Sequence, residues 1–558
     1  MDSIAATRAI ADVASDIGLL PTDLEPYGWT KAKVRLDAID RHSNRPKGKY
    51  ILVTGITPTP LGEGKTTLSV GLAQALWKIG VKALVNVRQP SLGPVFGIKG
   101  GGTGGGKAQV IPSEEINCHL TGDFHAVTTA HNVCAAFLDN HLHHGNMLDI
   151  DPAAITWGRV LDVNDRALRD VETGAGKNNG PLRRTGFEIT AASEVMALLA
   201  MATDLADLRE RLGRIIVGFS RSGRAVTAED IQIAGGMAAL MKEAVKPNLL
   251  QTLEGTPALI HAGPFGNVAT GTSSIIADRL GLQIADAVVT EAGFGSDLGG
   301  EKFFNLKCRA SGLAPDVAVL VATVRGLKAL SPGIKIVPGK PLDSALLSEN
   351  LEALEEGVPN FIKHIENVRL HGVRVVVAIN TFPTDSPREI ARMIEVAIAA
   401  GADDATITNV YAQGGEGGIE LAMAAMKAAN AGSNFVPLYS LDSTPQEKIE
   451  RIATSMYGAG GVEYAPEALA KIELATAAGL GQLPICMAKT PYSFTGDAKI
   501  KGRPEGFTLL VRDLKIAAGA GFLTPLIGGI QTMPGLGSRP AGASIDITGN
   551  GETIGMSE

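Results

Sequence analysis

The feature that most constrains this 558-residue sequence is a glycine-rich loop between an apolar segment and a helix-patterned one. Tyr50–Thr54 is a short apolar run followed by turn residues, which predicts a buried strand. The loop Thr57–Thr67 follows at once, and apolar residues then repeat at helical spacing over Leu68–Ile79 until Gly80. A strand, a glycine loop and a helix in this order are typical of phosphate-binding α/β folds.

The residues of the loop are suited to bind a nucleoside triphosphate. Glycines let backbone N–H groups turn toward phosphate oxygens, and the start of a helix adds favourable partial charge. Lys65 would reach the β- and γ-phosphates, and the Thr66 hydroxyl would ligate Mg²⁺. The strict P-loop pattern has glycine where this chain has Thr59, so a purely structural glycine turn is the alternative. The residues expected to contact ATP are Thr59, Pro60, Leu61, Gly62, Glu63, Gly64, Lys65 and Thr66.

Strand-like and helix-like segments alternate along most of the chain, which favours a mostly parallel sheet. The predicted fold is α/β, with a large P-loop-type domain built on a doubly wound sheet and two smaller α/β domains. We expect a nucleotide-binding domain at 1–364, a second α/β domain at 365–463 that contributes to the ligand pocket, and a C-terminal domain at 464–558. Further strands are expected at 83–87, 258–261, 287–291, 316–323, 373–380 and 405–410, and helices at 349–371 and 387–400.

Composition excludes several classes of function. Lys and Arg number 51 against 58 Asp and Glu, and a net charge of −7 argues against a general nucleic-acid or anionic-membrane binder. The four cysteines are widely spaced, so neither a disulfide scaffold nor a cysteine zinc site is expected. No segment reads as a signal peptide or as a membrane span, and a cytoplasmic enzyme is predicted.

The strand predicted at 83–87 ends at Arg88, where switch-type P-loop ATPases usually carry an acidic, metal-facing residue. A guanidinium beside the γ-phosphate would suit a second anion, such as a carboxylate or an acyl phosphate. A surface arginine is the alternative. The segment Lys99–Lys107 holds six glycines in nine positions, and it is interpreted as a lid or anion nest, with a plain linker as the alternative.

Asp123 follows Gly122 and precedes an apolar helical run, so it is either a helix N-cap or a carboxylate that faces an amine. The histidines nearby are spaced six residues apart, at His119, His125 and His131, and do not share a helix face, which argues against a metal triad. Two aromatics, Phe382 and Tyr411, stand at predicted strand ends, where open α/β sheets bind ligands. A pair of rings there would sandwich a planar heterocycle, whereas either ring alone is more often part of a core.

A set of motifs in this chain resembles the formate–tetrahydrofolate ligases. The resemblance runs in order from about residue 25 to the C-terminal MPGLG, and it rests on TPLGEGKTT, PSLGPVFGIKGG, INCHLTGDFHAVTTAHN, KPNLLQTLEGTPALIHAGPF, TEAGFGSDLGGEKF, NTFPTD and QGGEGG. It implies ATP-dependent ligation of formate to tetrahydrofolate through formyl phosphate, giving 10-formyltetrahydrofolate, ADP and phosphate. It also implies a homotetramer that uses Mg²⁺ and is activated by a monovalent cation, K⁺ or NH₄⁺.

Carried over motif by motif, the resemblance implies that Lys65 holds the transferred phosphate and that Arg88 holds the formyl phosphate. Asp123 would lie beside the attacking folate amine, and Phe382 and Tyr411 would flank the folate ring system. The chain departs from the family pattern at four positions, with Gln89 in place of glutamate, Lys107 in place of tyrosine, Thr270 in place of histidine and Tyr411 in place of tryptophan.

Two other functions remain open from the residues alone. A switch-type P-loop ATPase that acts through a partner would carry a second lysine early in the loop and an acid in place of Arg88. An ATP-dependent ligase for another carboxylate would share the first half of the chain but would leave the loops that resemble folate-binding segments unexplained.

Overall fold

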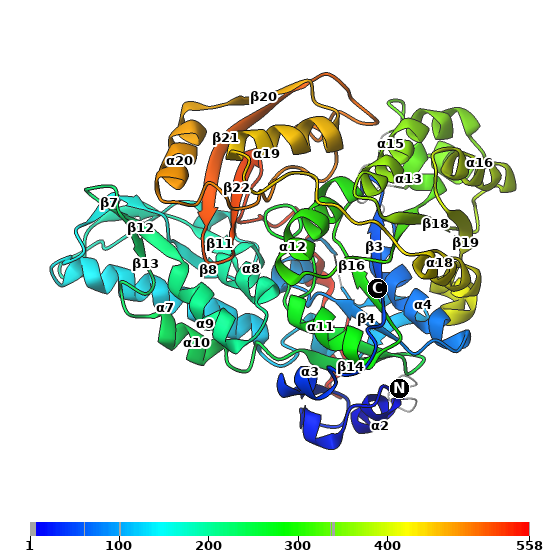
Figure 1. Cartoon of the computed structure of the whole chain (residues 1–558), viewed down its shortest axis with the longest axis horizontal. Helices are drawn as coiled ribbons and strands as arrows, with labels where there is room; N and C mark the ends of the chain where they lie inside the picture. Colours follow the sequence, from blue (N-terminus) through cyan, green and yellow to red (C-terminus); the bar gives the residue numbers. More distant parts are fainter. Residues whose placement is uncertain (1–6, 61, 100–101, 335, 337–340, 557–558) are drawn as a thin grey trace.

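The computed structural model describes residues 7–60, 62–99, 102–334, 336 and 341–556, and a twelve-stranded sheet forms its centre (Figure 1). The main path of the sheet runs β1-β2-β14-β15-β4-β16-β3-β17-β18-β19, with β6 beside β14 and β5 beside β6. In chain order the strands are β1 (Leu24–Pro26), β2 (Ala32–Val34), β3 (Lys49–Gly55), β4 (Ala83–Val87), β5 (Gly104–Gly105), β6 (Ala108–Ile111), β14 (Asn248–Thr252), β15 (Pro257–Ile260), β16 (Ala287–Glu291), β17 (Val317–Ala322), β18 (Arg374–Asn380) and β19 (Asp404–Thr408).

The seven strands from β15 to β19 are all parallel, and the antiparallel pairings gather beyond β15 at one edge of the sheet. The predicted mixed α/β fold with a large, mostly parallel sheet is therefore confirmed. Because parallel strands share one carboxyl edge, the loops after β3, β4, β16, β17, β18 and β19 all reach that edge.

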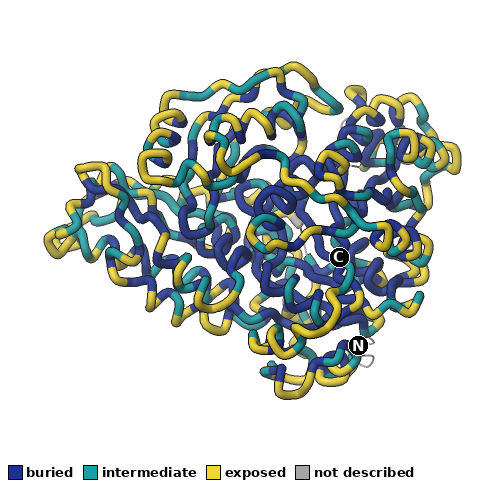
Figure 2. Tube along the Cα trace, in the orientation of Figure 1, coloured by how far each residue is buried: buried dark blue, intermediate teal, exposed yellow. Residues whose placement is uncertain are grey.

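Helices cover both faces of the sheet, because alternate strand residues point to opposite sides. On β3, Ile51 and Val53 join the core beneath α4 (Lys65–Lys78) and α18 (Ile419–Ala431). Tyr50 and Leu52 join the opposite core, to which α11 (Ile275–Ile284), α15 (Leu351–Arg369) and α16 (Pro387–Ala399) contribute. All residues of β4, β16 and β17 are buried, and buried residues gather in the middle of the molecule (Figure 2).

The expected second domain at 365–463 does not form a sheet of its own. β18 pairs with β17 over six residues and β19 pairs with β18, so both strands extend the central sheet. The apolar run was predicted correctly as a strand, but its sequence carries no sign of which sheet it joins. The strand expected at 405–410 ends at Thr408, and Val410 begins the short helix α17 (Val410–Gln413).

Two further units flank the central sheet. Residues between β6 and β14 form a mainly helical unit with a small sheet ordered β13-β12-β7, built from α7 (Asp123–His143), β7 (Ile150–Ile155), α8 (Glu194–Met201), α9 (Leu205–Arg214), β12 (Ile216–Ser220), β13 (Ala225–Thr227) and α10 (Ala234–Met241). A C-terminal unit has its own core between Tyr439 and Ile527, from α19 (Pro445–Ile452), β20 (Gly461–Tyr464), α20 (Pro466–Ala477), β21 (Thr508–Ala517) and β22 (Phe522–Ile527). None of the individual strands of this unit was predicted.

Shorter elements complete the described chain, and no described helix is both long enough and apolar enough to cross a bilayer. The short helices are α2 (Ile10–Asp16), α3 (Asp37–Arg41), α5 (Leu92–Pro94), α6 (Ser113–Asn117), α12 (Cys308–Ser311), α13 (Val324–Lys328) and α14 (Ser344–Leu347). The remaining strands are β8 (Arg159–Leu161), β9 (Val171–Thr173), β10 (Arg183–Thr185), β11 (Phe187–Ile189), β23 (Asp546–Ile547) and β24 (Thr553–Ile554).

The close packing of α17 on α4 generates a first prediction. A methyl group at Gly71 of α4 would lie 2.3 Å from Cβ of Val410, whereas one at Gly235 of α10 would lie 3.9 Å from the flexible Arg209 side chain. Alanine normally stabilises a helix relative to glycine by up to about 1 kcal/mol. Gly71→Ala should instead lower the free energy of unfolding by roughly 1–3 kcal/mol through overpacking, while Gly235→Ala should raise it slightly. Denaturant midpoints of the two variants test this, and equal stabilisation by both would contradict the packing.

Candidate active site at the carboxyl edge of the sheet

The glycine-rich loop leaves the end of β3 and enters α4 at Lys65. Gly64 takes the left-handed conformation with φ of 73°, which turns the chain into the helix. The Lys65 side chain lies back along the loop, since a methyl group on Gly55 would lie 3.1 Å from its Cδ atom. Its Nζ atom is 3.7 Å from Oε2 of Glu63. A cationic group and the first turn of a helix therefore face the same space beyond β3.

Glu63 and Asn380 hold the loop in this open turn. Oε1 of Glu63 accepts hydrogen bonds from the backbone N–H of Thr59 at 2.7 Å and from its hydroxyl at 3.1 Å. The side chain is buried, and that burial raises the pKa of the Glu63 carboxyl. Asn380, at the end of β18, donates from Nδ2 to the carbonyl oxygen of Glu63 at 3.2 Å. Thr59, which was expected to contact ATP, thus stabilises the turn of the loop itself. Leu61, also expected to contact ATP, lies outside the described residues.

The start of the loop is fixed by α15. The hydroxyl of Thr57 lies 2.9 Å from Nε2 of His364 and accepts a hydrogen bond from Nδ2 of Asn360, also at 2.9 Å. Ser296 contacts the other ring nitrogen of His364 at 2.8 Å. Burial lowers the pKa of His364 to about 4, so the ring is neutral at physiological pH. It therefore holds the loop by hydrogen bonding and adds no charge to it.

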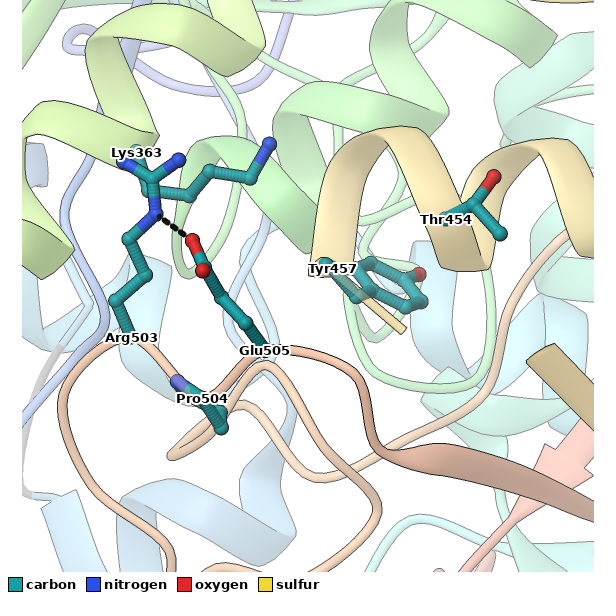
Figure 3. Close-up of a pocket in the computed structure, with 7 residues that line it drawn as sticks. Lys363, Thr454, Tyr457, Arg503, Pro504 and Glu505 are labelled. Carbon is teal, nitrogen blue, oxygen red and sulfur yellow. Dashed lines mark hydrogen bonds and ion pairs between the residues drawn. The ribbon is translucent and has the colours of Figure 1, made fainter. Parts of the chain in front are cut away.

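The C-terminal unit reaches the same loop through Asn360, which also donates to the carbonyl oxygen of Gly502 at 2.9 Å. Beside this contact is a cavity of about 300 Å³ between α15 and the C-terminal unit (Figure 3). Its charged groups are already engaged, because Arg503 donates to Glu505 at 3.0 Å and Lys363 donates to the carbonyl oxygen of Ser455 at 2.6 Å. The charged side chains that line the cavity are thus already bound to protein groups.

Arg88 and Glu291 form an ion pair at the same edge. Nη2 of Arg88, directly after β4, is 3.7 Å from Oε1 of Glu291, the last residue of β16. Nη1 of Arg88 also donates to the carbonyl oxygen of Pro264 at 3.1 Å, and Gly293 leaves room for the guanidinium. Since β16 lies between β4 and β3, the strand end next to the glycine loop carries an acid. The sequence argument that Arg88 replaces that acid was wrong, because chain order does not reveal that β16 inserts between β3 and β4.

Asp123 is neither a helix cap nor an exposed carboxylate. Gly122 is the N-cap of α7, and Asp123 is the first residue of the helix. Its Oδ1 atom lies 2.8 Å from Nζ of Lys33 on β2, and its Oδ2 atom accepts from Nδ2 of Asn248 at 2.7 Å. The Lys33 and Asp123 side chains are 0% and 3% exposed. Both carboxylate oxygens are thus occupied by protein groups.

Phe382 and Tyr411 follow neighbouring strand ends, since Asn380 of β18 lies opposite Thr408 of β19. Tyr411 is 62% exposed, and its carbonyl oxygen accepts from the backbone N–H of Lys107 at 2.9 Å. A methyl group at Gly105 would lie 3.2 Å from the Tyr411 ring, and one at Gly106 would overlap its carbonyl oxygen. The described half of the glycine segment is therefore packed against Tyr411, which does not fit a free lid; Gly100 and Gly101 lie outside the described residues.

The aromatic pair and Asp123 lie on opposite sides of the glycine loop. Asp123 contacts β14, and six steps along the sheet separate β14 from β18, which precedes Phe382. Both oxygens of Asp123 are hydrogen-bonded to Lys33 and Asn248, which favours a supporting role for this side chain. The expectation that Asp123 faces the folate amine stays a prediction, which the variants described below test.

Nearly the whole chain is similar in sequence to one protein family. A model of the family described as formate–tetrahydrofolate ligase matches residues 2–557. A protein of Roseiflexus castenholzii named formate–tetrahydrofolate ligase is 55% identical, covering 99% of this chain and 98% of its own. Proteins with the same name from Saccharopolyspora erythraea and Cutibacterium acnes are 54% and 52% identical, covering 99% and 98% of this chain and 98% and 97% of their own.

The buried Lys33–Asp123 pair generates the second prediction. Asp123→Asn removes the negative charge and leaves the Lys33 ammonium buried without it, which should cost about 3–5 kcal/mol of unfolding free energy. The double change Lys33→Met with Asp123→Leu removes both charges and should recover most of that loss. As a control, Asp37→Asn acts on a carboxylate that is 50% exposed and should change stability by less than about 1 kcal/mol. Chemical denaturation of the four proteins measures these values.

The folded double variant also tests direct catalysis by Asp123. We expect it to keep turnover within a fewfold of the unchanged protein, since Asp123 contacts protein groups alone. A proton acceptor typically contributes about 10²- to 10⁴-fold in rate. A loss of that size in the folded double variant would restore Asp123 as the acceptor, and wild-type stability of Asp123→Asn would contradict the buried pair.

Proposed function

The chain belongs to the formate–tetrahydrofolate ligase family, and from that premise we propose which of its residues perform the reaction. It is an ATP-dependent ligase that joins formate to tetrahydrofolate in one-carbon metabolism, giving 10-formyltetrahydrofolate, ADP and phosphate. One observation carries the assignment of residues. Lys65 and Arg88, the two cations best suited to hold phosphate and acyl phosphate, follow strands separated only by β16 at one edge of the sheet.

The first step activates formate. A carboxylate acylates poorly because its oxygen would have to leave as hydroxide or oxide. In our proposal a formate oxygen attacks the γ-phosphorus, the bond to ADP breaks, and that oxygen becomes part of a phosphate leaving group. Lys65, which begins α4, would neutralise charge on the transferred phosphoryl group. The Arg88 fork, held by Pro264 and Glu291, would bind two oxygens of the formyl phosphate.

The second step transfers the formyl group. The folate amine attacks the formyl carbon, the tetrahedral adduct collapses, and the carbon–oxygen bond to phosphate breaks. Phosphate leaves as a strongly basic trianion, so we assign the proton of the amine to it. Negative charge grows on the carbonyl oxygen during attack, and the preorganised Arg88 donors would stabilise it.

Phe382 and Tyr411 are proposed to flank the folate ring. Their support is the neighbouring position of the two strand ends and the exposure of Tyr411. We assign Asp123 a structural role in place of the expected contact with the folate amine: it holds α7 against β2 and β14 through Lys33 and Asn248. This role is supported by the hydrogen bonds that already occupy both carboxylate oxygens.

The oxygen donors at the edge fit Mg²⁺, which prefers hydroxyl, carboxylate and phosphate oxygens. Thr66, the second residue of α4, and Glu291, at the end of the strand beside β3, would hold it. When bound, Mg²⁺ neutralises charge on the β- and γ-phosphates. A P-loop-type nucleotide domain and a cytoplasmic location are further parts of the proposal, which rest on the sequence patterns. Activation by K⁺ or NH₄⁺ and a homotetramer are parts that rest on the family resemblance alone.

The third prediction distinguishes the role of Arg88 from that of Lys65. Arg88→Ala and Arg88→Lys should each lower formyl transfer by roughly 10²- to 10³-fold, because the planar fork that meets two developing oxyanions is lost. Their affinity for Mg-ATP should fall little. Lys65→Ala should weaken nucleotide binding and catalysis together. Arg209→Ala, at a surface ion pair with Glu229, is the matched control and should change neither.

Nucleotide affinity from calorimetry and formyl transfer from absorbance of the folate product provide the two readouts. Near wild-type formylation by Arg88→Ala would make Arg88 a bystander and would remove the basis of the proposed site. Unchanged nucleotide affinity in Lys65→Ala would mean that the loop does not hold the phosphates.

A further inference from the structure

Arg325 lies directly against Phe382. It is the second residue of α13, the short helix that follows β17, and its guanidinium carbon is 4.1 Å from the centre of the Phe382 ring. Nη2 of Arg325 donates to the hydroxyl of Thr384 at 2.7 Å, so the guanidinium is tied to the turn that carries the ring. A cation at this distance over a ring face is attracted by the ring's quadrupole.

The turn that carries Phe382 is itself fixed. The backbone N–H of Phe382 donates to Oδ2 of Asp385 at 2.8 Å, and Asn380 anchors the start of the turn to the glycine loop. On the other side, the hydroxyl of Thr323 caps α13 by accepting from the N–H of Gly326 at 2.8 Å. The backbones on both sides of the Arg325–Phe382 contact are therefore held by hydrogen bonds.

The strand order places the loops that carry Arg325 and Tyr411 on either side of the loop that carries Phe382, because β18 lies between β17 and β19. The Arg325 guanidinium covers one face of the phenyl ring. A flat ligand would therefore have to stack on the other face.

We propose that Arg325 is a positioning residue, which fixes the Phe382 ring and thereby sets the affinity for the flat ring of the folate. The inference rests on the proposed function, in which Phe382 and Tyr411 flank that ring. A free phenylalanine side chain would have to be immobilised when the ligand binds, whereas a ring already held by Arg325 is ordered beforehand. The guanidinium also draws ring electron density toward itself, which lessens the repulsion between the open face and a stacked π system.

The test compares Arg325→Met, Arg325→Lys and Phe382→Ala with Arg388→Met. Arg388 is an exposed arginine of α16, paired with Glu349 at 2.7 Å, and serves as the matched control. Arg325→Met should raise KM for tetrahydrofolate about tenfold, equivalent to about 1.4 kcal/mol, with kcat at saturating folate within about twofold. Arg325→Lys keeps the charge but loses the planar fork and should give an intermediate KM. Arg388→Met should match the unchanged enzyme.

A double variant separates positioning from a general structural effect. If Arg325 acts through the ring, Arg325→Met should add almost nothing to KM in a Phe382→Ala background, whereas independent contributions would multiply. Multiplying effects, or an unchanged KM in Arg325→Met while Phe382→Ala raises it, would overturn the inference and leave the ring assignment standing. An unchanged KM in Phe382→Ala would instead overturn the ring assignment of the proposed function. Should Arg325→Met fold poorly, the Arg325→Lys comparison in both backgrounds decides the same question.

Discussion

Everything at the carboxyl edge depends on holding one loop open between β3 and α4. A chain leaving a buried strand must expose backbone N–H groups to bind phosphate, and those groups are costly unless the turn is fixed by other contacts. Here three distant segments fix it, since Asn380 holds Glu63, Asn360 and His364 hold Thr57, and the C-terminal unit meets Asn360 at Gly502. The large sheet and the C-terminal unit therefore act together as the frame of the loop.

The same edge of the sheet also places two cationic side chains beside carboxylates. Lys65 lies near Glu63, and Arg88 lies near Glu291, so each cation expected to meet an anionic substrate already faces a carboxylate. Both contacts are 3.7 Å long, which leaves the cations held without a short ion pair. In the proposed mechanism these held cations meet phosphate oxygens, and preorganised donors are what stabilise charge that develops during acyl and phosphoryl transfer. The edge thus suits a ligase that makes and then uses an acyl phosphate.

Local patterns predicted the seven parallel strands of the central sheet, and β4 and β16 begin and end at the predicted residues. The antiparallel strands at the edge of the sheet and the strands of the flanking units were not predicted. The strand order was not predictable, because pairing depends on contacts between residues hundreds of positions apart. The strand order places Glu291 beside the glycine-rich loop and includes β18 and β19 in the central sheet. Asp123 is an example of a contact that local sequence does not indicate. The residues around it predicted the start of a helix, and α7 begins there. Nothing near Asp123 in the sequence indicates that it pairs with Lys33 on β2. The motifs identified the family without this long-range information.

In the proposed mechanism, formate is phosphorylated at this edge of the sheet before the folate amine attacks. This order of steps can be tested with formate labelled with ¹⁸O, together with ATP and tetrahydrofolate, by mass spectrometry of the released phosphate. We expect each phosphate to carry one oxygen from formate, because that oxygen bonds to the γ-phosphorus and leaves with it. Phosphate without the label, formed in equal amount with ADP and 10-formyltetrahydrofolate, would show that formate is not phosphorylated.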